Sequence, residues 1–194
     1  VFNAIRILAL GVAIGLVVIG AGFAALGVKH GTRVTWQVPN RFETILASFA
    51  LARLGAIQNP ILHLYRHKEV GYAITATKAE VVLVPGEWNG FDFGAMVHEL
   101  VADLPADTRP QVIDIFAELP EADAAGLGPA PASGDEVRWI YFTSGTTSDP
   151  KGVRHTDRTL ITGAWGMAAA LDMQPDDVGS IAFPFAHIAG PDYF

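Results

Sequence analysis

Hydrophobic positions along this chain switch between the spacing of a buried strand and that of a helix. Residues 81–84 form a continuous apolar run, which is typical of a strand covered on both faces in a parallel sheet. Residues 42–54 carry apolar side chains three and four positions apart, which predicts a helix that ends at Gly55. The same criteria predict further strands at 32–38, 56–61, 111–116, 137–142 and 178–183, and further helices at 66–77, 92–104 and 156–171.

Strands that alternate with helices at this pace predict an α/β fold with layered, parallel-rich sheets and flanking helices. Asn40 is expected to cap the helix at 42–54, with Glu43 three residues later completing a capping box. Residues 118–136 are rich in Ala, Gly, Pro and acidic residues without periodicity, and they predict a long connecting loop.

The first 28 residues form a hydrophobic segment whose setting the sequence leaves open. Residues 7–28 are uncharged, and a helix of that length would extend about 33 Å, which is enough to cross the hydrocarbon core of a bilayer. However, five glycines interrupt the run, and it leads without a linker into the predicted strand at 32–38. Residues 1–28 are therefore either a core helix or a membrane anchor, and residues 29–194 form the remaining domain.

Composition narrows the range of partners. The formal net charge is −7 and the chain has no long basic run, which argues against nucleic acid as a partner. The chain has no cysteine, so disulfides, thiolate metal sites and a cysteine nucleophile are all excluded. This composition fits a reducing compartment, and a cytoplasmic location is expected, with possible membrane association through residues 7–28.

A loop rich in small and hydroxyl-bearing residues follows the predicted strand at 137–142 and ends in Lys151. Gly145 allows the backbone to approach an anion, and successive backbone N–H groups in a tight turn form an anion-binding concavity. Lys151 adds one compact, mobile positive charge suited to a polyphosphate. The loop differs from a Walker A motif, because Pro150 precedes the lysine and Gly152 follows it.

The run Tyr141-Phe-Thr-Ser-Gly-Thr-Thr-Ser-Asp-Pro-Lys-Gly152 resembles the signature of the adenylate-forming (AMP-binding) superfamily, with Ser148 in place of the usual glycine. The resemblance implies that the loop binds the phosphates of ATP and that the Thr143 hydroxyl lies near Mg²⁺. Lys151 would stabilise the charge on departing pyrophosphate. The nucleotide-binding residues it implies are Thr143, Ser144, Gly145, Thr146, Thr147, Ser148, Lys151 and Gly152.

A second stretch, Phe183-Pro-Phe-Ala-His-Ile-Ala-Gly190, resembles the next motif of the same superfamily. There an aromatic residue and a histidine line the acyl pocket, which makes His187 a candidate catalytic residue beside Lys151. His187 is expected at the end of the buried strand predicted at 178–183, on the edge of the sheet where ligands bind.

Residues 55–66 and 84–92 resemble the acyl-CoA synthetase branch, and within it ligases for medium-chain or alicyclic carboxylates. The implied reaction converts a small carboxylic acid and ATP, with Mg²⁺, to an acyl-adenylate and then transfers the acyl group to CoA. The chain resembles only the N-terminal part of such an enzyme, without the small C-terminal domain, and is expected to be inactive alone. Two alternatives stay open: transfer to a carrier-protein thiol, and a non-catalytic, membrane-attached module.

Overall fold

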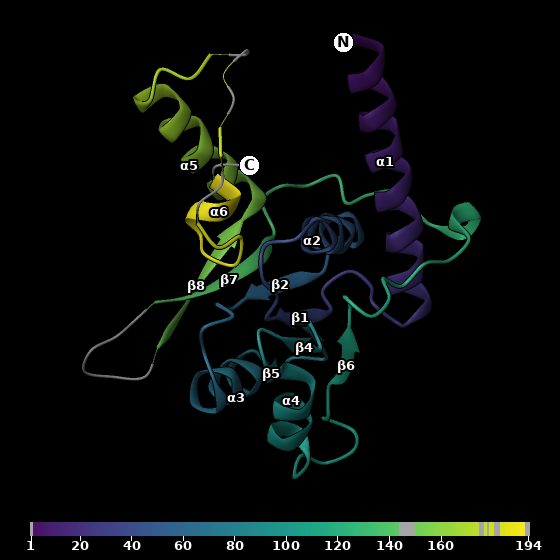
Figure 1. Ribbon diagram of the computed structural model, residues 1–194, viewed down its shortest axis with the longest axis vertical. Helices are drawn as coiled ribbons and strands as arrows, with labels where there is room; N and C mark the ends of the chain where they lie inside the picture. The colour runs from purple at the N-terminus through teal and green to yellow at the C-terminus, as the bar shows by residue number, and fades with distance from the viewer. Residues whose placement is uncertain (1, 144–149, 175–176, 178, 181–182, 193–194) are drawn as a thin grey trace.

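The computed structural model describes residues 2–143, 150–174, 177, 179–180 and 183–192. Its helices and strands alternate along the chain (Figure 1). The helices are α1 (Phe2–Ala25), α2 (Phe42–Leu54), α3 (His67–Thr77), α4 (Phe93–Val101), α5 (Asp157–Ala170) and α6 (Ala189–Asp192), with a 3₁₀ turn at Ala124–Gly126. The strands are β1 (Arg33–Trp36), β2 (Ile57–Pro60), β3 (Val81–Val84), β4 (Glu87–Trp88), β5 (Phe91–Asp92), β6 (Gln111–Asp114), β7 (Val137–Thr143) and β8 (Lys151–Thr156).

Six of the strands form one sheet in the order β6-β3-β1-β2-β7-β8. All neighbouring pairs are parallel except β7 and β8, which pair antiparallel as a hairpin at one edge. The prediction of an α/β fold with a parallel-rich sheet is confirmed. Strands β4 and β5 form a separate two-stranded ribbon.

The alternation of side chains along β3 shows why helices cover both faces of the sheet. Val81 and Leu83 pack into a core shared with α1 and α2, whereas Val82 and Val84 pack into a second core shared with α3 and α4. Successive residues of a strand point to opposite faces, so a continuous apolar run can serve two cores. Figure 1 shows α2 on one side of the strands and α3 and α4 on the other.

The second half of α1 belongs to the first core. Ile19 and Phe23 are buried, at 3% and 0% exposed, and they pack in the cluster that contains Leu51 of α2. Ile14, nearer the start of the helix, is 56% exposed. In the described part of the chain, no helix combines the length and the apolar character that crossing a membrane requires.

Two sequence predictions need correction. The helix at 42–54 forms, but Asn40 does not cap it: Arg41 occupies the N-cap position, its side chain makes no capping hydrogen bond, and it pairs with Glu43 instead. The side-chain amide of Asn40 instead hydrogen-bonds to the backbone of Phe183 and Phe185, which are far away in the sequence. The strand predicted at 178–183 is not seen at residues 179–180 or 183; residues 178, 181 and 182 lie outside the described residues.

The loop at 118–136 is tied down at its end, just before β7. Glu136 lies 2.7 Å from His30 Nε2, and the hydrogen bond from His30 lowers the pKa of Glu136 below its usual value. The hydrogen-bonded guanidinium of Arg158 likewise lowers the pKa of Asp135. A carboxyl with a lowered pKa stabilises the folded state above its ordinary titration range, and this contribution is lost as the pH falls through the lowered value.

Candidate functional site

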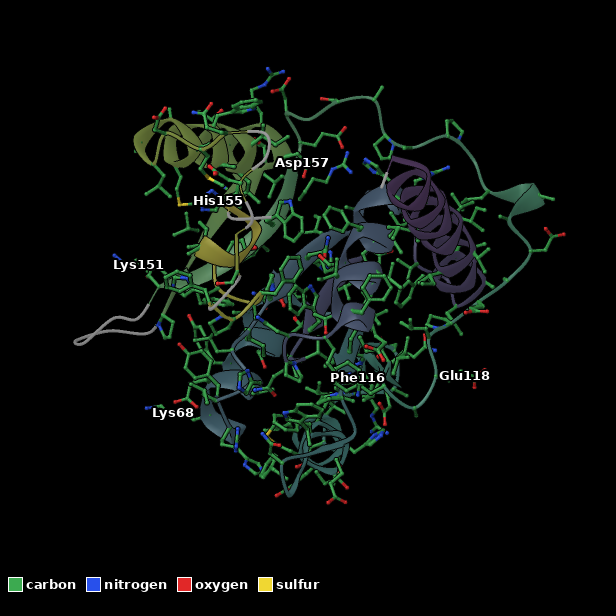
Figure 2. The ribbon with its side chains drawn as sticks, turned by 45° about the horizontal axis from the view of Figure 1, so that its top comes forward. Lys68, Phe116, Glu118, Lys151, His155 and Asp157 are labelled. Atoms are coloured by element: carbon green, nitrogen blue, oxygen red, sulfur yellow. The ribbon has the colours of Figure 1, made fainter. Side chains whose placement is uncertain are left out.

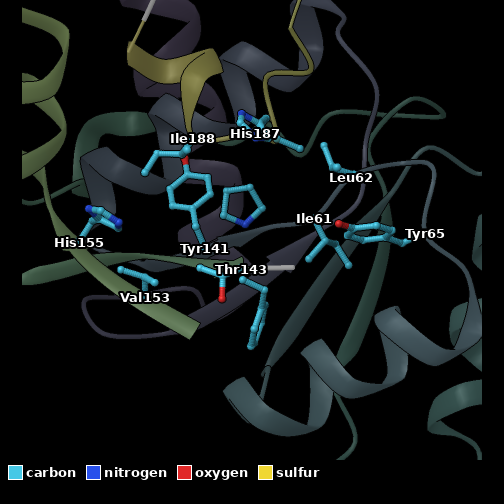
Figure 3. A pocket seen from close by; sticks show the side chains of 12 residues that line it. Ile61, Leu62, Tyr65, Tyr141, Thr143, Val153, His155, His187 and Ile188 are labelled. Carbon is cyan, nitrogen blue, oxygen red and sulfur yellow. The ribbon is translucent and has the colours of Figure 1, made fainter. Parts of the chain in front are cut away.

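A cavity of about 450 Å³ opens at the carboxyl ends of β2 and β7 (Figure 3). In parallel sheets of this class, ligands bind at the carboxyl ends of the strands. Three parts of the chain line it: the segment after β2, the hairpin, and the turn before α6. The lining residues are Pro60, Ile61, Leu62, Tyr65, Tyr141, Phe142, Thr143, Val153, His155, Ala186, His187 and Ile188.

The phosphate-loop candidates lie at the open end of the β7–β8 hairpin. Thr143 and Lys151 are direct partners in the antiparallel register, and both are exposed. Thr143 also lines the cavity, so the base of the loop and the cavity share a wall. Figure 2 shows Lys151 at the loop end of the hairpin and His155 nearer to α5. The predicted residues Ser144, Gly145, Thr146, Thr147 and Ser148 lie outside the described residues.

Gly152 is packed closely against the neighbouring strand. A Cβ added at Gly152 would come within 3.1 Å of Ile140 Cγ2 and 3.3 Å of a ring carbon of Phe142. Both distances are shorter than ordinary van der Waals contact, so a side chain there would require the Ile140 and Phe142 side chains to shift by a few tenths of an ångström. Gly152 therefore fits closely beside these two side chains.

Two side chains from other strands and helices anchor the base of the loop. The Tyr72 hydroxyl on α3 donates a hydrogen bond of 2.9 Å to the carbonyl oxygen of Pro150, and its ring packs edge-on against Phe142. On β7, the carbonyl oxygen of Ile140 accepts a 2.8 Å hydrogen bond from Asn59 Nδ2. Pro150 directly follows the loop and Ile140 lies in the strand that precedes it, so the body of the domain holds the chain on both sides of the loop.

His187 lies in a turn at 185–188 just before α6, and not at the end of a strand as the sequence suggested. Its imidazole lines the cavity and stacks on Phe183, with ring centroids 6.4 Å apart. The backbone N–H of Ala189 donates to Nδ1 at 3.1 Å. Because a backbone N–H can only donate, neutral His187 carries its proton on Nε2 and can donate from that atom.

His155 is a cavity residue that the sequence analysis did not identify as a candidate. Its ring packs edge-on against Tyr141 with centroids 6.0 Å apart, and it lines the cavity together with Val153. The missing signal was the strand itself: residues 151–156 form β8, so positions 153 and 155 share one face. Lys151 has the same parity along the strand, which places it on that face as well.

A metal site made of protein ligands alone is not present in the described ranges. No group of three or more His, Asp or Glu side chains there could hold an ion. Thr143, the predicted Mg²⁺ contact, offers one exposed hydroxyl oxygen. Mg²⁺ prefers oxygen ligands and usually reaches proteins through one or two side chains plus phosphates and water. This donor is therefore compatible with an ion that arrives with a nucleotide.

Comparison with known proteins gives the family. The family model described as AMP-binding enzyme matches residues 18–194. Over 151 residues the chain is 33% identical to 2-hydroxy-7-methoxy-5-methyl-1-naphthoate–CoA ligase of Streptomyces carzinostaticus, covering 70% of this chain and 27% of that protein. Over 173 residues it is 31% identical to salicyl-AMP ligase/salicyl-S-ArCP synthetase of Mycobacterium tuberculosis, covering 86% of this chain and 31% of that protein.

The fold has solved counterparts. The structure of o-succinylbenzoate CoA synthetase from Bacillus subtilis, in complex with its acyl-adenylate intermediate, superimposes with a TM-score of 0.74 at 22% identity, covering 94% of this chain and 44% of that one. The chain thus spans about a third of the length of the curated relatives it matches. The family match over residues 18–194, together with the signature at the hairpin, shows that this chain belongs to the AMP-binding enzyme family.

Proposed function

We propose that this chain forms the phosphate-binding and part of the acyl-binding site of an ATP-dependent carboxylate–CoA ligase. A carboxylate oxygen of the acid attacks the α-phosphorus of ATP, the bond between the α-phosphorus and the bridging oxygen breaks, and pyrophosphate leaves. The CoA thiol, after losing its proton, then attacks the acyl carbon and AMP leaves. The proposal rests on the open end of the β7–β8 hairpin, where Thr143 and Lys151 are paired beside a cavity that His187 also lines.

Each residue of the site has a task that follows from its chemistry. Lys151 brings positive charge to the oxygens of the leaving pyrophosphate, where negative charge accumulates as the bond breaks. Mg²⁺ bound with the nucleotide would supply further charge neutralisation, and the Thr143 hydroxyl would be one of its oxygen ligands. His187 donates from Nε2 to orient the substrate carboxylate.

The lining of the cavity suits a largely apolar acyl group. Ile61, Leu62 and Val153 make its surface mostly apolar, as in most small-molecule sites. The acyl group expected from the sequence is medium-chain or alicyclic. Two of the relatives are named for a naphthoate and a salicyl group, so we include aryl acids and propose a ring-bearing carboxylate.

The test is acid-dependent exchange of labelled pyrophosphate into ATP by the intact enzyme that carries this chain. Cyclohexanecarboxylate, benzoate, salicylate and octanoate serve as substrates, and a reaction without acid serves as the control. We expect exchange with the ring acids and thioester only when CoA is added. Exchange with none of the acids would overturn the proposal, whereas transfer only to a carrier-protein thiol would favour the alternative of a carrier-loading enzyme.

The 194-residue chain alone is expected to give neither exchange nor acyl-CoA. It spans about a third of its relatives, so it presents the hairpin and the cavity without the rest of the fold. Detectable acyl-adenylate from the isolated chain would contradict this expectation.

Removing the Tyr72 hydroxyl should weaken nucleotide binding selectively. Tyr72→Phe keeps the ring against Phe142 but removes the hydrogen bond to Pro150, which is worth about 1 kcal/mol. We expect the KM for ATP to rise roughly fivefold while the KM for the acid changes little. Thr75→Val, which removes an exposed hydroxyl from the same helix, is the matched control. Equal changes in both KM values would count against an anchoring role for Tyr72.

A further inference from the structure

Two walls of the cavity are fastened to the four residues that leave β1, which we call the β1 exit segment (residues 37–40). The first wall is held by Gln37, whose side chain is 0% exposed. Its Nε2 donates to the carbonyl oxygens of Leu62, at 2.9 Å, and Tyr65, at 3.0 Å. Leu62 and Tyr65 both line the cavity. An amide NH₂ has two hydrogens, so both are used on this wall.

The second wall is held by Asn40. Its Nδ2 donates to the carbonyl oxygen of Phe183 at 2.8 Å, and its Oδ1 accepts the backbone N–H of Phe185 at 2.6 Å. These two bonds hold the start of the turn that carries His187 into the cavity lining. The ring of Phe185 is buried against Trp36, with centroids 6.0 Å apart, so the end of β1 supports this turn through side-chain packing as well.

Both walls lie outside the regular sheet. The segment after β2 and the turn before α6 are irregular, so neither is held by a continuous ladder of backbone hydrogen bonds. Their positions therefore depend on side-chain hydrogen bonds and packing. Gln37 and Asn40 supply four such bonds from within one stretch of four residues, which couples the position of one wall to that of the other.

The hydrogen bonding of the Gln37 side chain indicates that this residue serves to position the first cavity wall. Its Oε1 is buried and has no hydrogen-bond partner among the described residues. A buried, unpaired polar atom is unfavourable, so an apolar side chain of similar length would fill the same core site at lower cost. The feature that such a replacement could not reproduce is the pair of bonds to Leu62 and Tyr65.

We propose that Gln37 and Asn40 are positioning residues that set the separation of the two cavity walls and thereby select which carboxylates the site accepts. The effect on substrate selection rests on the proposed function, whereas the hydrogen bonds themselves do not depend on which reaction the site catalyses. Residues at the end of β1 would then influence which acid binds in the cavity without contacting the substrate themselves.

Three variants of the intact enzyme test the proposal. Gln37→Met removes the bonds to the first wall while preserving side-chain length. Asn40→Asp keeps the acceptor for Phe185 and removes the donor to Phe183, and because Asn40 is exposed the variant is expected to fold. Gln58→Met is the matched control: Gln58 is an equally buried amide on the adjacent strand, and its bonds go to Trp36 and Ser48, with no direct hydrogen bond to either cavity wall.

We expect Gln37→Met and Asn40→Asp to raise the KM for the acid about tenfold and to leave the KM for ATP within about twofold. The ratio of kcat/KM for cyclohexanecarboxylate over octanoate should also shift about tenfold. Gln58→Met should lower the Tm and leave that ratio at the wild-type value. An unchanged ratio in the first two variants, or a matching shift in Gln58→Met, would overturn the proposal.

Amide hydrogen exchange separates failure of this inference from failure of the proposed function. If the wild-type enzyme activates none of the acids, the proposed function is wrong. The positioning role of Gln37 and Asn40 is then tested by amide hydrogen exchange alone. A fourth variant, Asn40→Ala, also removes the acceptor for the Phe185 N–H and should speed exchange of that amide. Gln37→Met should speed exchange over residues 62–65, with no such change at either place in Gln58→Met. Unaltered exchange at both walls would overturn the positioning role even in an active enzyme.

Discussion

Lys151→Ala is expected to lower acid-dependent pyrophosphate exchange by about a hundredfold to a thousandfold. Removing one group that stabilises charge developing in the transition state has effects of that size. Lys151 is exposed at the end of β8, so its loss should leave the Tm close to wild type. The reduction should appear in kcat, because the charge on pyrophosphate grows as the bond to the α-phosphorus breaks.

Arg154→Ala is the control for Lys151→Ala. Arg154 carries the same charge on the same strand and is also exposed, but its parity along β8 places it on the face opposite Lys151 and the cavity-lining Val153. We expect its activity to stay within about threefold of wild type, as screening by solvent predicts for a remote exposed charge. Comparable losses in the two variants would point to a general effect of charge and against a specific role for Lys151.

Much of the sheet could be predicted because its strands carry their own signal. The run at β3 is continuously apolar since it serves two cores, and α2 shows apolar residues at helical spacing and ends at Gly55, whose φ of 74° suits glycine. The helix expected at 156–171 also forms, as α5, and Thr156 caps it by accepting from the backbone N–H of Thr159. These are local properties, readable within a window of a few residues.

The features that were missed depend on partners far away in the chain. β8 contains Lys, Gly, Arg and His, which are weak strand formers, and it exists because β7 offers an edge for it to pair with. Unless residues 151–156 are recognised as a strand, the sequence does not show that alternating side chains place His155 in the cavity. Asn is a residue type that often caps helices, but the side-chain amide of Asn40 hydrogen-bonds to backbone groups more than 140 residues later. A local pattern cannot distinguish these uses.

The docking of α1 can be tested with one substitution at two positions of the same helix. A Cβ added at Gly22 would overlap the backbone carbonyl group of Pro120, and a backbone atom cannot rotate away. The contact is reinforced where the backbone N–H of Ala122 donates to Val18 at 3.3 Å. We expect Gly22→Ala to lower the free energy of unfolding by about 3 kcal/mol, because the loop at 119–122 must separate from α1.

Gly15→Ala should have the opposite sign. No atom lies within 4 Å of a Cβ built at Gly15, so the change adds no clash and removes the backbone entropy cost of glycine in a helix. A gain of about 0.5 to 1 kcal/mol is expected. Urea unfolding of both variants under identical conditions measures the difference. If Gly22→Ala were as well tolerated as Gly15→Ala, α1 could not be packed against the loop at 119–122, and its place in the first core would have to be abandoned.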